Sequence, residues 1–219
     1  MIVELGHFAL ILAFCVAVFQ MIVPLIGAHK GWGGWMAVAS PAASMQFALT
    51  AVSFGALTYA FVTSDFSLNL VVANSHTDKP LLYKITGVWG NHEGSLLLWV
   101  LILTLFGACA AWFGGKLPPT LRARVLAVQS SVAVAFFAFI LWTSNPFLRL
   151  VVPPFNGQDL NPLLQDPGLA FHPPFLYLGY VGLSMAFSFA VAALIEGHVD
   201  AAWGRWVRPW TLAAWVFLT

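Results

Sequence analysis

Five long stretches without Asp, Glu, Lys or Arg dominate this sequence, and each is long enough to cross a lipid bilayer. A transmembrane helix needs about 20 consecutive apolar residues. Of the 219 residues, 60% are hydrophobic and only 8% are charged, which a soluble domain of this size could not hide in one core. We therefore expect an all-α, polytopic transmembrane helical bundle. The predicted spans cover residues 5–28, 37–64, 94–115, 125–148 and 173–195.

A sixth apolar run begins at Pro209 and has reached only eleven residues when the sequence ends at Thr219. That is about half of what a span requires. We expect this run to be the start of a sixth helix. We also expect residues 1–219 to form a single transmembrane domain and to be the N-terminal part of a longer chain.

Basic residues are distributed unequally between alternate loops, and this distribution predicts the orientation. One set of loops carries six Lys or Arg and the other set carries three. Because cytoplasmic loops are enriched in basic residues, the N-terminus is predicted to lie outside. Two long outer loops then span about residues 65–93 and 149–172, where polar side chains are concentrated. The six inner residues are Lys30, Lys116, Arg122, Arg124, Arg205 and Arg208, and the three outer ones are Lys79, Lys84 and Arg149.

Several function classes are excluded or weakened by the sequence. The net charge is only +1 and the charged residues form no basic stripe, so nucleic acid is not an expected partner. The lipid bilayer is an expected partner because of the apolar spans. No phosphate-binding loop, dinucleotide fingerprint, GxSxG or HExxH motif is present, so a soluble enzyme has no support. The five spans contain no Asp, Glu, Lys or Arg, which weakens ion-coupled transport. Cys15 and Cys109 lie in apolar runs and are interpreted as small hydrophobic residues.

His92 lies in WGNHEGSLLLW, residues 89–99, at the outer mouth of the third predicted span. Gly90 and Gly94 in this stretch let the backbone approach another group closely. Two interpretations are open. Asn91 and Glu93 could simply satisfy the free N–H groups of a helix N-terminus, or His92 could belong to a binding site together with Trp89.

His172 occupies the corresponding place before the fifth span, in GLAFHPPFLYLGYVG, residues 168–182. Proline is tolerated in the first turn of a helix, so Pro173 and Pro174 predict that the helix starts there, with His172 at its mouth. A neutral imidazole among aromatic residues suits one axial side of an iron-porphyrin, although a plain helix-start histidine is the alternative. The remaining histidines are expected to be solvated or interfacial: His29, His76, His198 and His7.

Four stretches together resemble the CcmF family of cytochrome c-type biogenesis proteins, a group of haem-handling membrane proteins that is related to CcmC and CcsA. They are WGNHEGSLLLW, TSNPF, DLNPLLQDPGLAFHPPFLYLGYVG and RPWTLAAWVFLT. The resemblance implies a haem lyase component, that is, a subunit of a holocytochrome c synthase complex. It would receive haem b from the membrane-anchored haem chaperone CcmE and position it for thioether attachment to the CxxCH motif of apocytochrome c. CcmH and in some systems CcmI would be further partners.

The resemblance also implies a location and site residues. The location is the bacterial inner (cytoplasmic) membrane, with the functional loops facing the periplasm. His172 corresponds to the first of two outer histidines that ligate the haem iron, and Trp89 and His92 are further candidates for the same surface. Lys79, Lys84 and Arg149 lie on the side where haem propionates would be, or are ordinary loop charges. A transmembrane transporter of haem or another hydrophobic anion is the alternative function, and a structural assembly subunit is a third.

Overall fold

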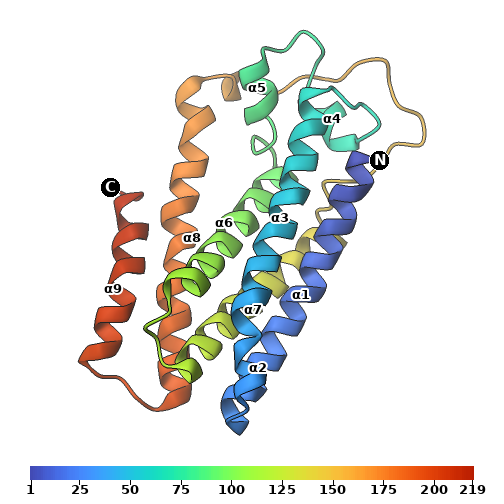
Figure 1. The fold of residues 1–219 in the computed structure, drawn as a ribbon. Helices are drawn as coiled ribbons and strands as arrows, with labels where there is room; N and C mark the ends of the chain where they lie inside the picture. The colour runs from blue at the N-terminus through green and yellow to red at the C-terminus, as the bar shows by residue number, and fades with distance from the viewer.

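The computed structural model describes residues 1–219, except for the side chain of Leu169, and confirms an all-α fold (Figure 1). Five helices, counting the α2–α3 segment as one, are long and apolar enough to cross a membrane, as predicted. The helices are α1 (Ile2–Lys30), α2 (Gly33–Ala37), α3 (Ala39–Val62), α4 (Asn69–Asn74), α5 (Leu81–Thr86), α6 (His92–Phe113), α7 (Pro119–Trp142), the short 3-10 helix η1 (Pro162–Leu164), α8 (Pro167–Glu196) and α9 (Ala201–Val216).

The long helices pack as neighbours in an up-and-down bundle. Helix α1 packs on α3 and α7, α3 packs on α6, α8 contacts α6 and α7, and α9 packs on α8. The N-terminus, α4, α5 and the starts of α6 and α8 lie at one end, which we call the loop end (Figure 1). The turns between α6 and α7 and between α8 and α9 lie at the opposite end, together with α2. Both predicted outer loops therefore share one end with the N-terminus.

A buried glutamine on α7 links three of these helices. The Nε2 atom of Gln129 donates hydrogen bonds to the Leu103 carbonyl on α6 at 3.2 Å and to Ser184 Oγ on α8 at 2.9 Å. Its Oε1 atom accepts a 2.7 Å hydrogen bond from Ser188, also on α8. Polar side chains between membrane helices hold the helices together because hydrocarbon offers them no other partner.

A second polar contact joins α1, α3 and α7. Gln46 Nε2 donates to Ser130 Oγ at 3.1 Å, and Ser130 in turn donates to the Ala17 carbonyl at 2.9 Å. Gln20 donates to the Leu126 carbonyl at 3.1 Å, while its own Oε1 atom is buried without a hydrogen-bond partner among the described residues. The two buried glutamines of α1 and α7, Gln20 and Gln129, thus differ in how completely they are satisfied.

Helices α7 and α9 begin several residues before the starts predicted for the fourth and sixth spans. The fourth span was expected at residues 125–148, but α7 begins at Pro119, which needs no N–H partner in the first turn, and ends at Trp142. It stops because Asn145 turns the chain by accepting a hydrogen bond from the Phe147 N–H at 3.0 Å. The sixth helix was expected to begin at Pro209, but α9 begins at Ala201, where the Asp200 side chain accepts from the Trp203 N–H at 2.8 Å.

The two ends of the bundle carry opposite charge. The loop end has six acidic and three basic side chains, whereas the opposite end has six basic and two acidic ones. At the opposite end, Arg124 on α7 pairs with Glu196 on α8 at 2.7 Å. This distribution agrees with an inner location of the opposite end under the positive-inside rule, so an outer N-terminus remains our prediction.

Candidate functional site

Helix α8 begins at Pro167, six residues before the first of the two prolines that were expected to start it. The expectation that Pro173 and Pro174 mark the start, with His172 at the mouth, is therefore wrong: both prolines lie inside the helix. The helix begins earlier because Asp166 caps it. The Asp166 side chain accepts a hydrogen bond from the Gly168 N–H at 2.8 Å, and its carbonyl accepts one from the Ala170 N–H at 2.8 Å. A capping aspartate followed by proline is a favourable helix start, since the first turn has free N–H groups.

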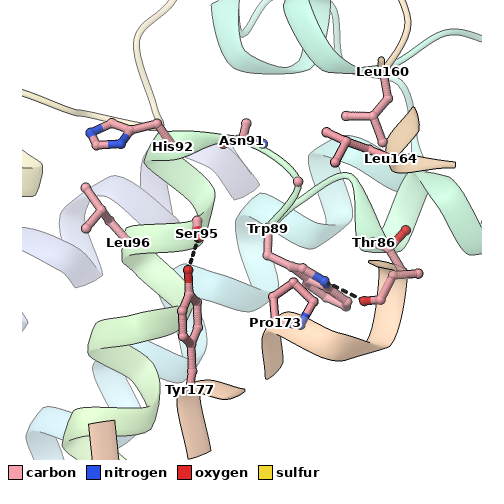
Figure 2. Close-up of a pocket in the computed structure, with 12 residues that line it drawn as sticks. Thr86, Trp89, Asn91, His92, Ser95, Leu96, Leu160, Leu164, Pro173 and Tyr177 are labelled. Atoms are coloured by element: carbon pink, nitrogen blue, oxygen red, sulfur yellow. Dashed lines mark hydrogen bonds between the residues drawn. The ribbon is translucent and has the colours of Figure 1, made fainter. Parts of the chain in front are cut away.

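Trp89 satisfies a carbonyl that the proline pair leaves without its helical donor. In an α-helix the N–H of residue 174 would bond to the carbonyl of residue 170, but Pro174 has no N–H. The indole Nε1 of Trp89 donates to the Ala170 carbonyl instead, at 2.9 Å (Figure 2). The turn before α6 is thereby tied to the start of α8, two residues before His172.

The turn that carries Trp89 is held in place at the N-terminus of α6. Asn91 is the N-cap: its Oδ1 accepts from the Gly94 N–H at 2.7 Å, and its Nδ2 donates to the Gly87 carbonyl at 2.8 Å. The helix-capping interpretation of Asn91 is thus confirmed. A Cβ atom on Gly94 would lie 1.7 Å from the Val88 carbonyl oxygen, so the close backbone approach expected at this glycine is made to its own preceding turn.

A cavity of about 470 Å³ lies between this turn, the start of α8 and the loop around η1. Its floor is closed by a 2.5 Å hydrogen bond between Ser95 on α6 and the Tyr177 hydroxyl on α8 (Figure 2). Leu160 and Leu164 cover it from the loop side. The lining residues are Thr86, Trp89, Gly90, Asn91, His92, Ser95, Leu96, Leu160, Leu164, Ala170, Pro173 and Tyr177.

His92 lines this cavity, but its imidazole is engaged elsewhere. Nε2 lies 3.1 Å from Ser144 Oγ, just after α7, and the ring meets Phe139 edge-on at 6.2 Å. Figure 2 shows the ring directed away from Trp89. His92 is therefore held between α6 and the end of α7.

His172 lies outside the cavity and is exposed. Among the described residues, its imidazole has no hydrogen-bond or ionic partner. Helical spacing places it on the same side of α8 as Phe175 and Gly179, which meet Phe217 and Leu218 at the end of α9. The structure therefore brings Trp89 and His92 together in one cavity. His172 lies on a face of α8 that does not line this cavity.

The other two loop-end histidines have partners. His7 Nε2 lies 3.1 Å from Asn145 Nδ2, and its ring stacks on Phe147 at 5.7 Å. The Asp78 N–H donates to Nδ1 of the partly exposed His76 at 3.2 Å. His29 and His198 are exposed at the opposite end, in agreement with the expectation that they are solvated.

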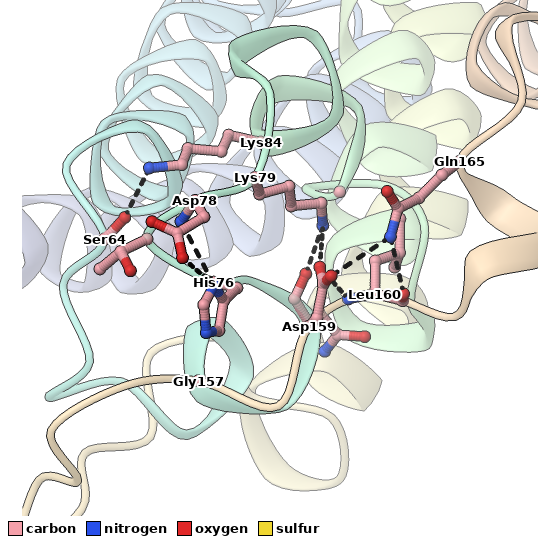
Figure 3. A network of polar contacts seen from close by, with 12 residues as sticks. Ser64, His76, Asp78, Lys79, Lys84, Gly157, Asp159, Leu160 and Gln165 are labelled. Carbon is pink, nitrogen blue, oxygen red and sulfur yellow. Dashed lines mark hydrogen bonds and ion pairs between the residues drawn. The ribbon is translucent and has the colours of Figure 1, made fainter.

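The three loop-end cations are all used within the protein. Lys79 has a side chain with 0% exposure, donates to the Asn74 carbonyl at 2.8 Å and lies 3.7 Å from Asp159 (Figure 3). Burial lowers the pKa of Lys79, the Asp159 carboxylate opposes this change, and the Lys84 charge adds to it. Lys84 itself donates to Ser64 Oγ at 2.9 Å (Figure 3).

The third cation, Arg149, bonds to Glu4 and to Ser67. Each of the three cations thus has a partner within the protein, although Arg149 is also exposed to solvent. Sequence reasoning missed their partners, and it also missed Ser144 beside His92, because these pairs are far apart in the chain and have no local motif.

The fold and the loop end define a polytopic helical membrane protein. It presents an exposed, unpaired histidine near a cavity that two leucines of the loop cover. The family model described as Cytochrome C assembly protein matches residues 89–219, which is more than half of the chain. The chain belongs to the cytochrome c assembly protein family.

Individual relatives agree with this assignment. The chain is 78% identical over 219 residues to the cytochrome c-type biogenesis protein ccl1 of Rhodobacter capsulatus, covering 100% of this chain and 34% of the relative. It is 48% identical over 220 residues to CcmF of Escherichia coli, again covering 100% of this chain and 34% of the relative. The solved structure of Cytochrome c Heme Lyase CcmF matches with a TM-score of 0.85 and 30% identity, over 100% of this chain and 34% of that one.

The resemblance to CcmF is therefore confirmed. The chain spans about one third of the length of these relatives.

Proposed function

We propose that the loop end binds haem and positions it for covalent attachment to apocytochrome c, with His172 as one axial ligand of the iron. One observation carries this assignment. Three of the four histidines at the loop end, His7, His76 and His92, have polar partners. The fourth, His172, is exposed and has no such partner among the described residues. Membership of the cytochrome c assembly family supports the identity of the ligand.

The surroundings of His172 fit a porphyrin. Phe171 and Phe175 are 52% and 54% exposed, so an apolar aromatic surface flanks the imidazole. An imidazole and an apolar setting are what a haem iron takes on one axial side. Bound haem b would supply the vinyl groups to which the two thiols of a CxxCH motif add. The contribution of this chain is to hold the ring in one place and orientation, which lowers the entropic part of the barrier.

The contacts of the loop-end cations argue against a role for them in binding the haem propionates. Lys79, Lys84 and Arg149 each have partners within the protein, and acidic side chains outnumber basic ones at this end. Recruiting any of them would leave Asp159 or Glu4, or the Ser64 hydroxyl, without its partner. We infer that the propionates point away from this cluster.

The wider setting completes the proposal. We place the protein in the bacterial inner membrane with the loop end in the periplasm. There it would receive haem from the chaperone CcmE and act with CcmH, and in some systems CcmI, as a subunit of the haem lyase. The greater basic charge of the opposite end supports this orientation.

Substitution of His172 tests the proposal directly. In the complete protein purified with the haem chaperone, His172→Ala should lose the visible absorption band of the loop-end haem and fail to support cytochrome c maturation. His198→Ala is the matched control, because it removes another exposed histidine from the opposite end and should leave both unchanged. An unchanged spectrum and unchanged maturation in His172→Ala would refute the assignment.

Trp89→Phe should change the haem spectrum without removing a ligand. The indole donor to the Ala170 carbonyl is lost, so the first turns of α8 loosen next to His172. We expect a loss of about 1 kcal/mol in the free energy of unfolding, together with weaker or heterogeneous ligation of the iron. Thermal unfolding and absorption spectroscopy measure the two effects.

A second tryptophan whose indole donates to a carbonyl of α8 provides the control for Trp89. Trp203 Nε1 donates to the Phe189 carbonyl at 3.2 Å near the other end of α8. Trp203→Phe should cost similar stability but leave the haem spectrum unchanged. Equal spectral effects of the two substitutions would show that Trp89 has no specific role in positioning His172.

A further inference from the structure

A second cavity, of about 410 Å³, lies at the opposite end of the bundle, remote from the start of α8 (Figure 1). It is formed by the end of α6, the turn that follows it and the part of α9 from Arg205 to Ala213. Its apolar wall includes Phe113, Leu117, Trp206 and Trp210, and its two charged side chains are Lys116 and Arg205. Phe113 is 76% exposed, so the apolar wall is continuous with the outer surface of the bundle.

Both cations of this cavity are available to a ligand. Lys116 and Arg205 are exposed, and neither has a hydrogen-bond or ionic partner among the described residues. The two acidic residues of this end are engaged elsewhere: Glu196 pairs with Arg124, and Asp200 caps α9. The cavity therefore has two uncompensated positive charges above an apolar, aromatic wall.

From this combination we infer that the cavity binds an anionic phospholipid. Lys116 and Arg205 would contact the headgroup phosphate, and the apolar wall would contact the upper part of an acyl chain. Tryptophan side chains are enriched at the level of lipid headgroups, and basic pockets between membrane helices attract anionic headgroups. A small soluble anion would use the two cations but not the aromatic wall.

Lipid retention by the complete, detergent-solubilised protein tests this inference. Native mass spectrometry would compare the apparent affinities for phosphatidylglycerol and phosphatidylethanolamine with matched acyl chains. The wild-type protein should prefer phosphatidylglycerol. Arg205→Gln should weaken its binding about fivefold, since one basic side chain near a lipid surface contributes about 1 kcal/mol. Adding Lys116→Gln should weaken it by about the same factor again.

Arg208→Gln is the matched control, because Arg208 is an exposed arginine on the same helix that does not line the cavity. It should leave phosphatidylglycerol binding within about twofold of wild type. If Arg205→Gln does not fold, Lys116→Gln alone gives the same test from the exposed turn. Equal losses in the Arg205 and Arg208 variants, equal affinity for the two lipids, or displacement of the lipid by inorganic phosphate would each overturn the inference.

Discussion

Replacing Gly94 with alanine should destabilise the protein by about 3 kcal/mol, because the new methyl group has no room. It would lie 1.7 Å from the Val88 carbonyl oxygen and 3.1 Å from Asn91 Oδ1. The nearer neighbour is a backbone atom, and the Asn91 side chain is held by its own hydrogen bonds, so the turn that carries Trp89 must move. We expect a lower melting temperature of the detergent-solubilised protein and, with Trp89 displaced, a weaker loop-end haem signal.

Gly55→Ala is the control for this prediction. Gly55 lies within α3, and a Cβ atom there would have no neighbour within 4 Å. Since glycine inside a helix costs up to about 1 kcal/mol relative to alanine, this substitution should be neutral or stabilising. If Gly94→Ala melts at the wild-type temperature, the described backbone approach at the start of α6 is incorrect.

Gln129→Leu is the second substitution with a large expected effect, about 2 kcal/mol. The change removes three hydrogen bonds that join α7 to α6 and α8, and each bond between membrane helices contributes about 0.6 kcal/mol on average. Ser184 loses a donor, while Ser188 can keep its bond to the Ser184 carbonyl at 2.9 Å. Thermal unfolding in detergent measures the loss.

Gln20→Leu is the comparison within the same bundle. Gln20 donates one hydrogen bond, and its buried Oε1 atom has no hydrogen-bond partner in the described structure. Removing an unsatisfied polar group offsets the lost bond, so we expect a change below about 1 kcal/mol. A larger loss for Gln20→Leu than for Gln129→Leu would contradict the role of Gln129 as the main polar link between α6, α7 and α8.

The fold was predictable because apolar length is a direct signal of a transmembrane helix, but the helix ends were not. Prolines at 173 and 209 were interpreted as starts, whereas the helices begin earlier at Asp166–Pro167 and after Asp200. An aspartate that can cap a helix and a proline a few residues later each predict a helix start, and the sequence does not show which one applies. In α8 the internal proline is tolerated because a side chain 81 residues away supplies the missing donor, which no local pattern reveals.

The residues of the candidate site could be predicted from motif similarity, but their arrangement in space could not. Motif similarity indicated Trp89, His92 and His172 as candidates, but their relation depends on packing between α6, the end of α7 and α8. The contact of His92 with Ser144 and the burial of Lys79 against Asp159 come from pairs that are separated by 52 and 80 residues. Such pairs have no periodicity or spacing that could be read from one sequence.

The indole bond between Trp89 and the Ala170 carbonyl also couples two places that could bind different molecules. Trp89 forms part of the cavity wall, and the carbonyl that it holds belongs to the backbone turn that presents His172. A molecule that enters the cavity and displaces the indole would change the backbone next to His172, the proposed iron ligand. If haem binds at His172 as proposed, that molecule would alter the affinity for haem by the same factor by which haem alters the affinity for the molecule, by thermodynamic reciprocity.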